Sequence, residues 1–151
     1  MDSAPFQPRE FGERTSGARY VGRPGSYAVA LEAWRLRLAL VRTRQGYFLP
    51  GGDAEEGEAE EETLAREVLE ECGCSVEVVQ RIGFAIQYTF AGGDAYYAKQ
   101  CTFFEVRLGE RIAEPTEIDH ALVWVPIAEA LELLVEESLR WAVEEALRTA
   151  T

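Results

Sequence analysis

The sequence of 151 residues has few of the features that mark secreted, membrane-spanning or zinc-binding proteins. Its three cysteines, Cys72, Cys74 and Cys101, form no C-x-x-C pair, and His120 is its single histidine, which argues against a disulfide framework and a His/Cys zinc site. No apolar run approaches the roughly 20 residues of a membrane-spanning helix, and the first residues do not resemble a secretory signal. We therefore expect a cytoplasmic protein without a membrane partner.

Basic residues are also scarce. The chain has 15 basic and 27 acidic residues, which gives a formal net charge of −12. Such an acidic chain is a poor partner for nucleic acid polymers and for anionic membranes. The hydrophobic content of 47% is typical of a folded protein, and the length fits one domain. We expect residues 1–26 to form an extended, partly ordered lead-in and residues 27–151 to form a single domain.

The predicted secondary structure mixes strands with helices in no regular alternation. Two apolar runs, 27–33 and 36–43, are separated by a short connection and are expected to pair as a hairpin. A turn at 91–94 predicts a second hairpin between two long strands. This order indicates the α/β class, with a mixed β-sheet flanked by helices. The remaining expected elements are a short strand at 47–49 that ends at Pro50, long strands at 76–90 and 96–108, a strand at 121–125, and helices at 58–71, 127–134 and 136–148.

The negative charge is concentrated in one segment. Between Asp53 and Glu71 there are ten acidic residues and a single basic one, Arg66, whereas residues 1–44 contain eight arginines and four acidic residues. On a helix, Leu64, Val68 and Cys72 form an apolar stripe. Four carboxylates share about 100° of another face at 100° per residue, namely Glu60, Glu67, Glu70 and Glu71.

Most charge runs are simply solvated helix faces, but this spacing is unfavourable for stability alone. Like charges three or four residues apart destabilise a helix by roughly 0.2–0.5 kcal/mol per pair. A hard divalent cation neutralises such carboxylates and bridges them to substrate phosphates. The spacing therefore favours a metal site on this helix over a merely solvated face.

The segment from Gly52 to Cys74 reads GDAEEGEAEEETLAREVLEECGC. Its glycines and charged residues, from Gly52 and Glu58 to Arg66-Glu67, Glu70-Glu71 and Gly73, resemble the signature of the Nudix hydrolases, and specifically of its MutT-like members. The one departure is Cys74, where the family usually has an aliphatic residue. So many fixed positions make the match specific. The flanking Leu49-Pro50-Gly51-Gly52 and Trp124-Val125-Pro126 also resemble the family, which extends the likeness from about Tyr27 to Arg148.

This resemblance implies an α/β/α sandwich and a divalent-metal-dependent hydrolase of nucleoside diphosphate-linked compounds. The implied cofactor is Mg²⁺, with Mn²⁺ as a substitute. Among the matched positions, Arg66 orients the first carboxylate and Glu58 supports the cluster. The residues that hold the metal are, by the same resemblance, Glu67, Glu70, Glu71 and the carbonyl of Gly51.

A nucleoside triphosphate is the expected substrate, because the chain has no large insertion after the motif. Hydrolysis of an ADP-sugar or of a dinucleoside polyphosphate stays open, as does a nucleotide-binding module without catalysis. An allylic diphosphate isomerase needs more histidines than this chain has. A homodimer is the default assembly for such a domain.

Candidates for substrate binding and proton transfer are found both among the expected metal-binding residues and elsewhere in the chain. The general base is expected among Glu71, Glu67 and Glu117, the last from a loop before the final strand. Arg42 and Arg44 end a strand beside the motif and are expected to bind phosphate, with Arg19 and Arg23 as weaker candidates. His120 is the remaining candidate for a phosphate contact or a base. Any of several aromatic residues could stack on a base, Tyr88 among them: Tyr47, Phe48, Tyr88, Phe90, Tyr96, Tyr97, Phe103 and Phe104.

Overall fold

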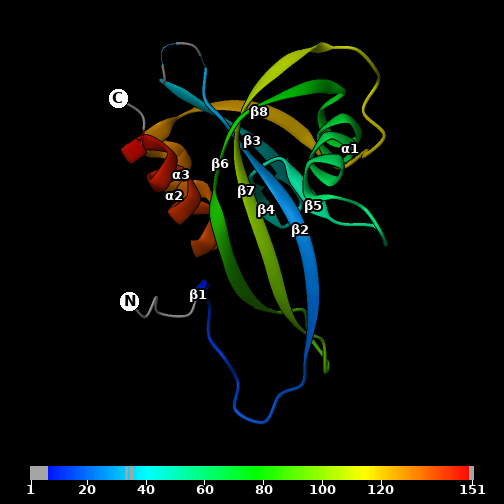
Figure 1. Ribbon diagram of the computed structural model, residues 1–151, viewed down its shortest axis with the longest axis vertical. Helices are drawn as coiled ribbons and strands as arrows, with labels where there is room; N and C mark the ends of the chain where they lie inside the picture. Colours follow the sequence, from blue (N-terminus) through cyan, green and yellow to red (C-terminus); the bar gives the residue numbers. More distant parts are fainter. Residues whose placement is uncertain (1–6, 33, 35, 150–151) are drawn as a thin grey trace, which may run out of the picture.

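The computed structural model describes residues 7–32, 34 and 36–149, and these residues form two β-sheets between layers of helices (Figure 1). The larger sheet has the strand order β1-β6-β7-β2-β5 and contains both parallel and antiparallel pairs. The smaller sheet has the order β4-β3-β8 and is antiparallel. The strands are β1 (Arg9–Phe11), β2 (Tyr20–Ala30), β3 (Arg37–Thr43), β4 (Gly46–Phe48), β5 (Gly51–Asp53), β6 (Cys74–Phe90), β7 (Tyr96–Arg111) and β8 (Ala121–Pro126).

The helices lie on opposite sides of the sheets: α1 (Glu60–Cys72) on one side, α2 (Ile127–Leu133) and α3 (Glu137–Thr149) on the other. Successive side chains of β2 point to opposite faces of the sheet, so the strand contributes to the core on both sides. Tyr27 and Val29 pack in the core with α2 and α3, while Ala28 and Ala30 pack in the core with α1. The expected mixed sheet flanked by helices is therefore confirmed. None of the helices in the described part of the chain has the length and apolar character to cross a bilayer.

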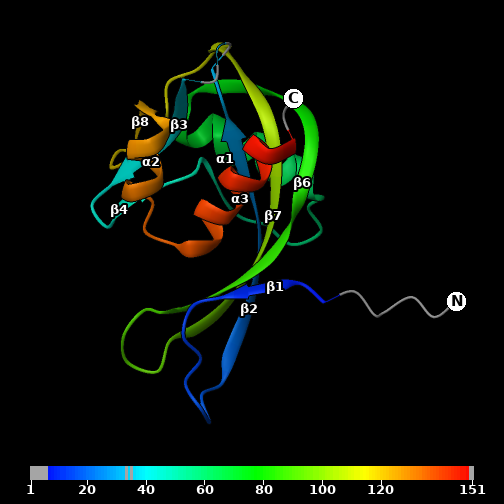
Figure 2. The same cartoon turned by 90° about the vertical axis from the view of Figure 1, so that its left-hand side faces the viewer.

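Three long strands extend beyond the helical layers and form an arm at one end of the molecule. Figures 1 and 2 show β2, β6 and β7 running downward past α2 and α3, with β1 crossing beside them. The arm is paired throughout, since β6 pairs with β7 from Cys74 to Phe90 and β7 pairs with β2 from Tyr20 to Ala30. Strand pairing in the arm therefore brings residues of β2 and β7 next to each other.

The expected hairpin between residues 27–33 and 36–43 is wrong. β2 pairs with β7 and β5, whereas β3 pairs with β4 and β8. The two runs meet at their ends, through an isolated bridge between Leu31 and Leu38 and through contacts of Glu32 with Arg37. Residues 25–30 of β2 are buried on both faces, so this strand needs the central position that the larger sheet provides. Ala33, the last residue of the first run, lies outside the described residues.

The glycine pair after Pro50 begins a strand, although the sequence predicts only the end of one there. Gly51–Asp53 forms β5, and its residues pair with Gly25–Tyr27 of β2. The chain therefore passes from the smaller sheet to the larger one at Pro50. Of the expected lead-in, residues 1–6 are outside the described residues, Arg9–Phe11 pairs with β6, and β2 already begins at Tyr20.

Candidate active site

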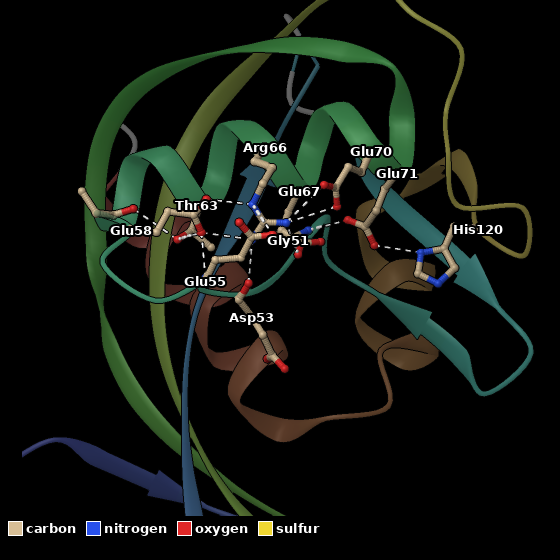
Figure 3. Close-up of polar contacts among 11 residues, drawn as sticks. Gly51, Asp53, Glu55, Glu58, Thr63, Arg66, Glu67, Glu70, Glu71 and His120 are labelled. Atoms are coloured by element: carbon tan, nitrogen blue, oxygen red, sulfur yellow. Dashed lines mark hydrogen bonds and ion pairs between the residues drawn. The ribbon is translucent and has the colours of Figure 1, made fainter.

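The carboxylates of Glu58, Glu67, Glu70 and Glu71 form a group that we call the acidic cluster, and Arg66 of α1 lies among them (Figure 3). Its Nε donates to Glu58 Oε2 at 2.7 Å, and its Nη1 donates to Glu67 Oε1 at 3.0 Å and to Glu70 Oε2 at 3.2 Å. Its Nη2 donates to the carbonyl oxygen of Asp53 at 2.8 Å, which joins the helix to β5. The Arg66 guanidinium lowers the pKa of the Glu58 carboxyl to about 2. One cation thus orients three carboxylates of the motif, as the resemblance implied for the first of them.

Glu58 belongs to the loop before α1, since the helix begins at Glu60 and not at residue 58 as expected. Its Oε1 accepts hydrogen bonds from the Thr63 hydroxyl at 2.7 Å and from the Glu55 N–H at 2.9 Å. These contacts fix the loop against the first turn of the helix. Glu60 does not join the cluster, because its carboxylate lies 3.6 Å from Arg81 of β6.

Glu71 is the most buried carboxylate of the cluster, with 5% of its surface exposed. Its Oε1 accepts the Gly51 N–H at 2.7 Å, and its Oε2 lies 3.0 Å from Nδ1 of His120. The pKa of the Glu71 carboxyl is raised to about 8, mainly by burial and further by the neighbouring charges of Glu67 and Glu117, while the hydrogen bond from Gly51 opposes the rise. Both oxygens are therefore oriented while the negative charge on the group is poorly compensated.

Glu67 lies directly beside the backbone of β5. A Cβ added to Gly52 would lie 2.6 Å from the carboxylate carbon of Glu67, so only glycine leaves room for this side chain. Burial raises the pKa of the Glu67 carboxyl, although the ion pair with Arg66 opposes this rise. The glycine of the motif thus has a steric function in the site.

The loop between β7 and β8 is attached to the C-terminal end of α1. The N–H groups of Thr116 and Glu117 both donate to the carbonyl oxygen of Glu70, at 2.8 and 3.2 Å. Gly73, which ends the helix with a φ of +72°, accepts at its carbonyl oxygen from Ile112. The attachment explains why Glu117 is close enough to raise the pKa values of the Glu67 and Glu71 carboxyls.

A cavity of about 510 Å³ opens beside Glu71 and β5, and we call it the central cavity. Its wall includes Glu71, Gly51 and His120 on the cluster side. Arg23 and Lys99 line it on the arm side. The cavity is thus lined by one carboxylate of the acidic cluster, that of Glu71, and by two cations.

A family model of the NUDIX domain matches residues 24–146. The chain belongs to the Nudix family. This membership makes the chain a hydrolase of acid anhydrides, in a family that generally uses divalent metals and acts on small nucleotide substrates.

Solved structures of Nudix proteins have the same fold. A NUDIX hydrolase from Nitrosomonas europaea is 19% identical, with a TM-score of 0.68 over 85% of this chain and 90% of that one. A mutator MutT protein from Bacillus halodurans is 24% identical, with a TM-score of 0.66 over 83% of this chain and 82% of that one. A UDP-X diphosphatase is 21% identical, with a TM-score of 0.62 over 90% of this chain and 68% of that one. No curated protein matches the sequence.

The donor set of this Nudix site fits a hard divalent cation. Glu67, Glu70 and Glu71 offer only carboxylate oxygens, which such cations prefer, and the raised pKa values of the Glu67 and Glu71 carboxyls reflect first their burial and then the repulsion between neighbouring carboxylates. Among the described residues, no three acidic, histidine or cysteine side chains already converge as a metal-holding group. Arg66 Nη1 binds Glu67 and Glu70 in this arrangement, so an ion competes with Arg66 for their oxygens.

The predicted substrate residues lie in different places. Arg42 and Arg44 border a surface depression that His120 also lines, and Arg44 forms an exposed ion pair with Asp119 at 3.4 Å. Tyr88 lies in the arm, where its hydroxyl donates to Glu10 at 2.6 Å, and it is not among the residues lining the central cavity.

Sequence reasoning gave Arg23 little weight and did not consider Lys99. The Arg23 guanidinium carbon lies 3.9 Å from the centre of the Tyr97 ring. Lys99 pairs with Glu136 at 2.8 Å. These contacts join distant parts of the chain, and no local spacing pattern would have found them.

Proposed function

We propose that this Nudix hydrolase is a Mg²⁺-dependent nucleoside triphosphate pyrophosphohydrolase that releases a nucleoside monophosphate and pyrophosphate. One observation carries the proposal: the carboxylate of Glu71 is held by Gly51 and His120 at the wall of the central cavity, beside the cluster that Arg66 organises. Glu67, Glu70, Glu71 and Gly51 are the residues that would hold the ion, with Mn²⁺ as its substitute. Arg42 and Arg44 line a depression that shares Thr43 and His120 with this cavity, and they suit a phosphate-bearing substrate.

The metal, when bound, neutralises phosphoryl oxygens and lowers the pKa of water. Arg66 holds Glu58, Glu67 and Glu70 close together on one face before metal and substrate bind. Glu71 or Glu117 accepts a proton from the water that attacks the phosphorus. Glu71 suits this part because both of its oxygens are oriented at the wall of the central cavity, by Gly51 and by His120. Glu117 suits it because its loop is attached to the helix of the cluster.

Hydrolysis of a nucleotide sugar is the second candidate. It is favoured by the similarity to a UDP-X diphosphatase, whose match covers 90% of this chain. An ADP-sugar or a dinucleoside polyphosphate would use the same acidic cluster, since each contains a pyrophosphate linkage. A nucleotide-binding module without catalysis is the remaining alternative, and the complete acidic cluster disfavours it.

A hydrolysis screen tests the proposal. Nucleoside triphosphates, nucleotide sugars and dinucleoside polyphosphates are incubated with the protein and Mg²⁺, Mn²⁺ or a chelator, and the products are separated by ion exchange. We expect metal-dependent turnover that is highest with a triphosphate and is lost in Glu71→Gln. The matched control is Glu61→Gln, a change at an exposed position on the first turn of α1. Absence of turnover on every compound would favour the binding module.

A further inference from the structure

Three cavities adjoin, because the central one shares lining residues with each of the other two. The central cavity shares Arg23, Tyr27, Asp53 and Lys99 with a second cavity of about 320 Å³, which we call the arm cavity and which Phe90, Tyr97 and Glu136 also line. On its other side it shares Thr43 and His120 with the depression at Arg42 and Arg44, about 330 Å³, which we call the arginine depression. Glu71 lines only the middle one of the three. The reacting centre therefore lies between two flanking sites.

The arm cavity combines balanced charge with aromatic surface. Lys99, the single lysine of the sequence, donates through Nζ to Oε1 and Oε2 of Glu136 at 2.8 and 3.1 Å. Their side chains are only 18% and 13% exposed. Arg23 packs on the Tyr97 ring and lies 3.6 Å from Asp53. Each cation of this cavity thus has its own carboxylate.

The arginine depression has the opposite character. Its lining contains two arginines and one carboxylate, that of Asp119, and the Arg44 side chain is 81% exposed in its ion pair with Asp119. Arg42 is exposed as well. The depression therefore presents excess positive charge to solvent, where flexible guanidinium groups can receive further phosphates.

We propose that the substrate binds in one direction, with its nucleobase in the arm cavity and its terminal phosphates in the arginine depression. The inference rests on the proposed function, because it assumes that a nucleotide spans the central cavity. It assigns Lys99 and Glu136 as the residues that contact the base edge, and Arg42 and Arg44 as those that contact the leaving pyrophosphate.

The chemistry of the two flanking sites determines this direction. A base edge offers an N–H donor next to a nitrogen or oxygen acceptor, which complements the Glu136 carboxylate next to the Lys99 ammonium. Its planar ring also suits the aromatic surface of Tyr97. A phosphate has only acceptors at neutral pH, so in the arm cavity it would meet the carboxylates of Glu136 and Asp53. The opposite orientation is therefore disfavoured by charge.

Separate binding of the two products tests this direction without depending on turnover. Calorimetry in Mg²⁺ measures the Kd of a nucleoside monophosphate and of pyrophosphate for the wild type, Glu136→Gln and Arg42→Gln. We expect Glu136→Gln to weaken monophosphate binding about tenfold, the factor for one lost charge-assisted hydrogen bond, without changing the Kd of pyrophosphate. Arg42→Gln should weaken pyrophosphate binding and leave the monophosphate Kd unchanged.

Three controls make the result decisive. Ribose 5-phosphate, which lacks a base, should bind Glu136→Gln and the wild type equally, whereas a sugar site in the arm cavity would make its Kd rise as well and would overturn the assignment to the base. Glu129→Gln and Arg107→Gln are matched changes at exposed positions that line none of the three cavities. A reversed pattern, or equal loss of both products in both variants, would overturn the inference. Absence of triphosphate hydrolysis with the expected binding pattern would contradict only the proposed function.

Discussion

The two sides of the central cavity are built in different ways. On the cluster side, Arg66 contacts residues one, four and eight positions away in the sequence. On the arm side, Lys99 and Glu136 are 37 positions apart, and Arg23 meets Asp53 and Tyr97 from a different strand. The contacts of Arg66 with the carboxylates are thus encoded by local spacing, whereas the arm side, like the contacts of Glu71 with Gly51 and His120, depends on the tertiary fold. We infer that the cluster side provides the chemistry and the arm side the recognition of the substrate.

The largest effect should come from Glu71 on the cluster side. Glu71→Gln keeps the shape of the side chain but removes the charge that the proposed metal and proton transfer need. We expect kcat to fall on the order of 10³-fold with little change in substrate affinity. Steady-state kinetics with the Glu61→Gln control measure this. A fall in substrate affinity with an unchanged kcat would show that Glu71 binds substrate rather than taking part in the chemistry, and the two sides of the cavity would then not differ in function.

Gly52→Ala should have the next largest effect, although it leaves every charge in place. The added Cβ would lie 2.6 Å from the Glu67 carboxylate and push it from its position. Because small displacements of reacting groups are costly, we expect kcat to fall about 10²-fold. Gly57→Ala, in the loop that follows β5, has nothing within 4 Å of the added Cβ. It brings only the strain of an alanine at a φ of +78°, which Gly52 does not have, so it measures how far loop strain without a clash lowers kcat. Equal losses in both variants would show that Glu67 placement is not the cause.

The pH dependence of stability tests the charge imbalance on the cluster side. The Glu71 carboxyl has a pKa of about 8 in the folded protein, against 4.5 ordinarily. Between these values the folded state keeps a proton that the unfolded state has released, so metal-free stability falls as pH rises through this window. We expect the Tm in a chelator to drop by on the order of 5 °C more in the wild type than in Glu71→Gln between pH 5.5 and 8.5. Added Mg²⁺ should restore the wild type at the higher pH. Identical pH profiles for the two proteins would show that Glu71 is not the poorly compensated charge.

The smallest effect should come from the arm side. Tyr97→Leu keeps an apolar side chain but removes the ring on which Arg23 packs. We expect KM to rise by about tenfold or less with kcat nearly unchanged, because the ring contacts substrate equally in the ground and transition states. Tyr96→Leu, the neighbouring position facing Tyr20 and Phe90, is the control. If Tyr97→Leu lowered kcat and left KM alone, recognition and chemistry would not be divided between the two sides.

The same contrast explains what the sequence could predict. The helix, its carboxylates and the contacts of Arg66 follow from spacings within one segment, and the structure has them. A helical wheel, which counts only angles, puts Glu60 on the face of the cluster, whereas in the fold its carboxylate lies 3.6 Å from Arg81 of β6. The strand pairing of residues 27–33 was wrong for a related reason. Burial on both faces of β2 is decided by distant strands, which no short window contains.

The contacts on the arm side of the cavity cannot be predicted from the sequence, because they depend on the sheet topology. Lys99 and Glu136 meet because β7 runs past the start of α3. No sequence spacing predicts a contact between two residues that are 37 positions apart. Tyr88, chosen from a set of aromatic residues, points instead to Glu10. The general base, a homodimer and the exclusion of nucleic acid polymers stay predictions, since nothing in the fold tests them.

The products of hydrolysis test the central claim most directly. A nucleoside triphosphate is incubated with the protein in water enriched in ¹⁸O, with Mg²⁺ or with a chelator, and the products are analysed by mass spectrometry. We predict a nucleoside monophosphate and pyrophosphate, a single ¹⁸O atom in one of them, and no reaction with the chelator or with Glu71→Gln. Turnover that persists in the chelator, or release of orthophosphate and a nucleoside diphosphate, would contradict the account.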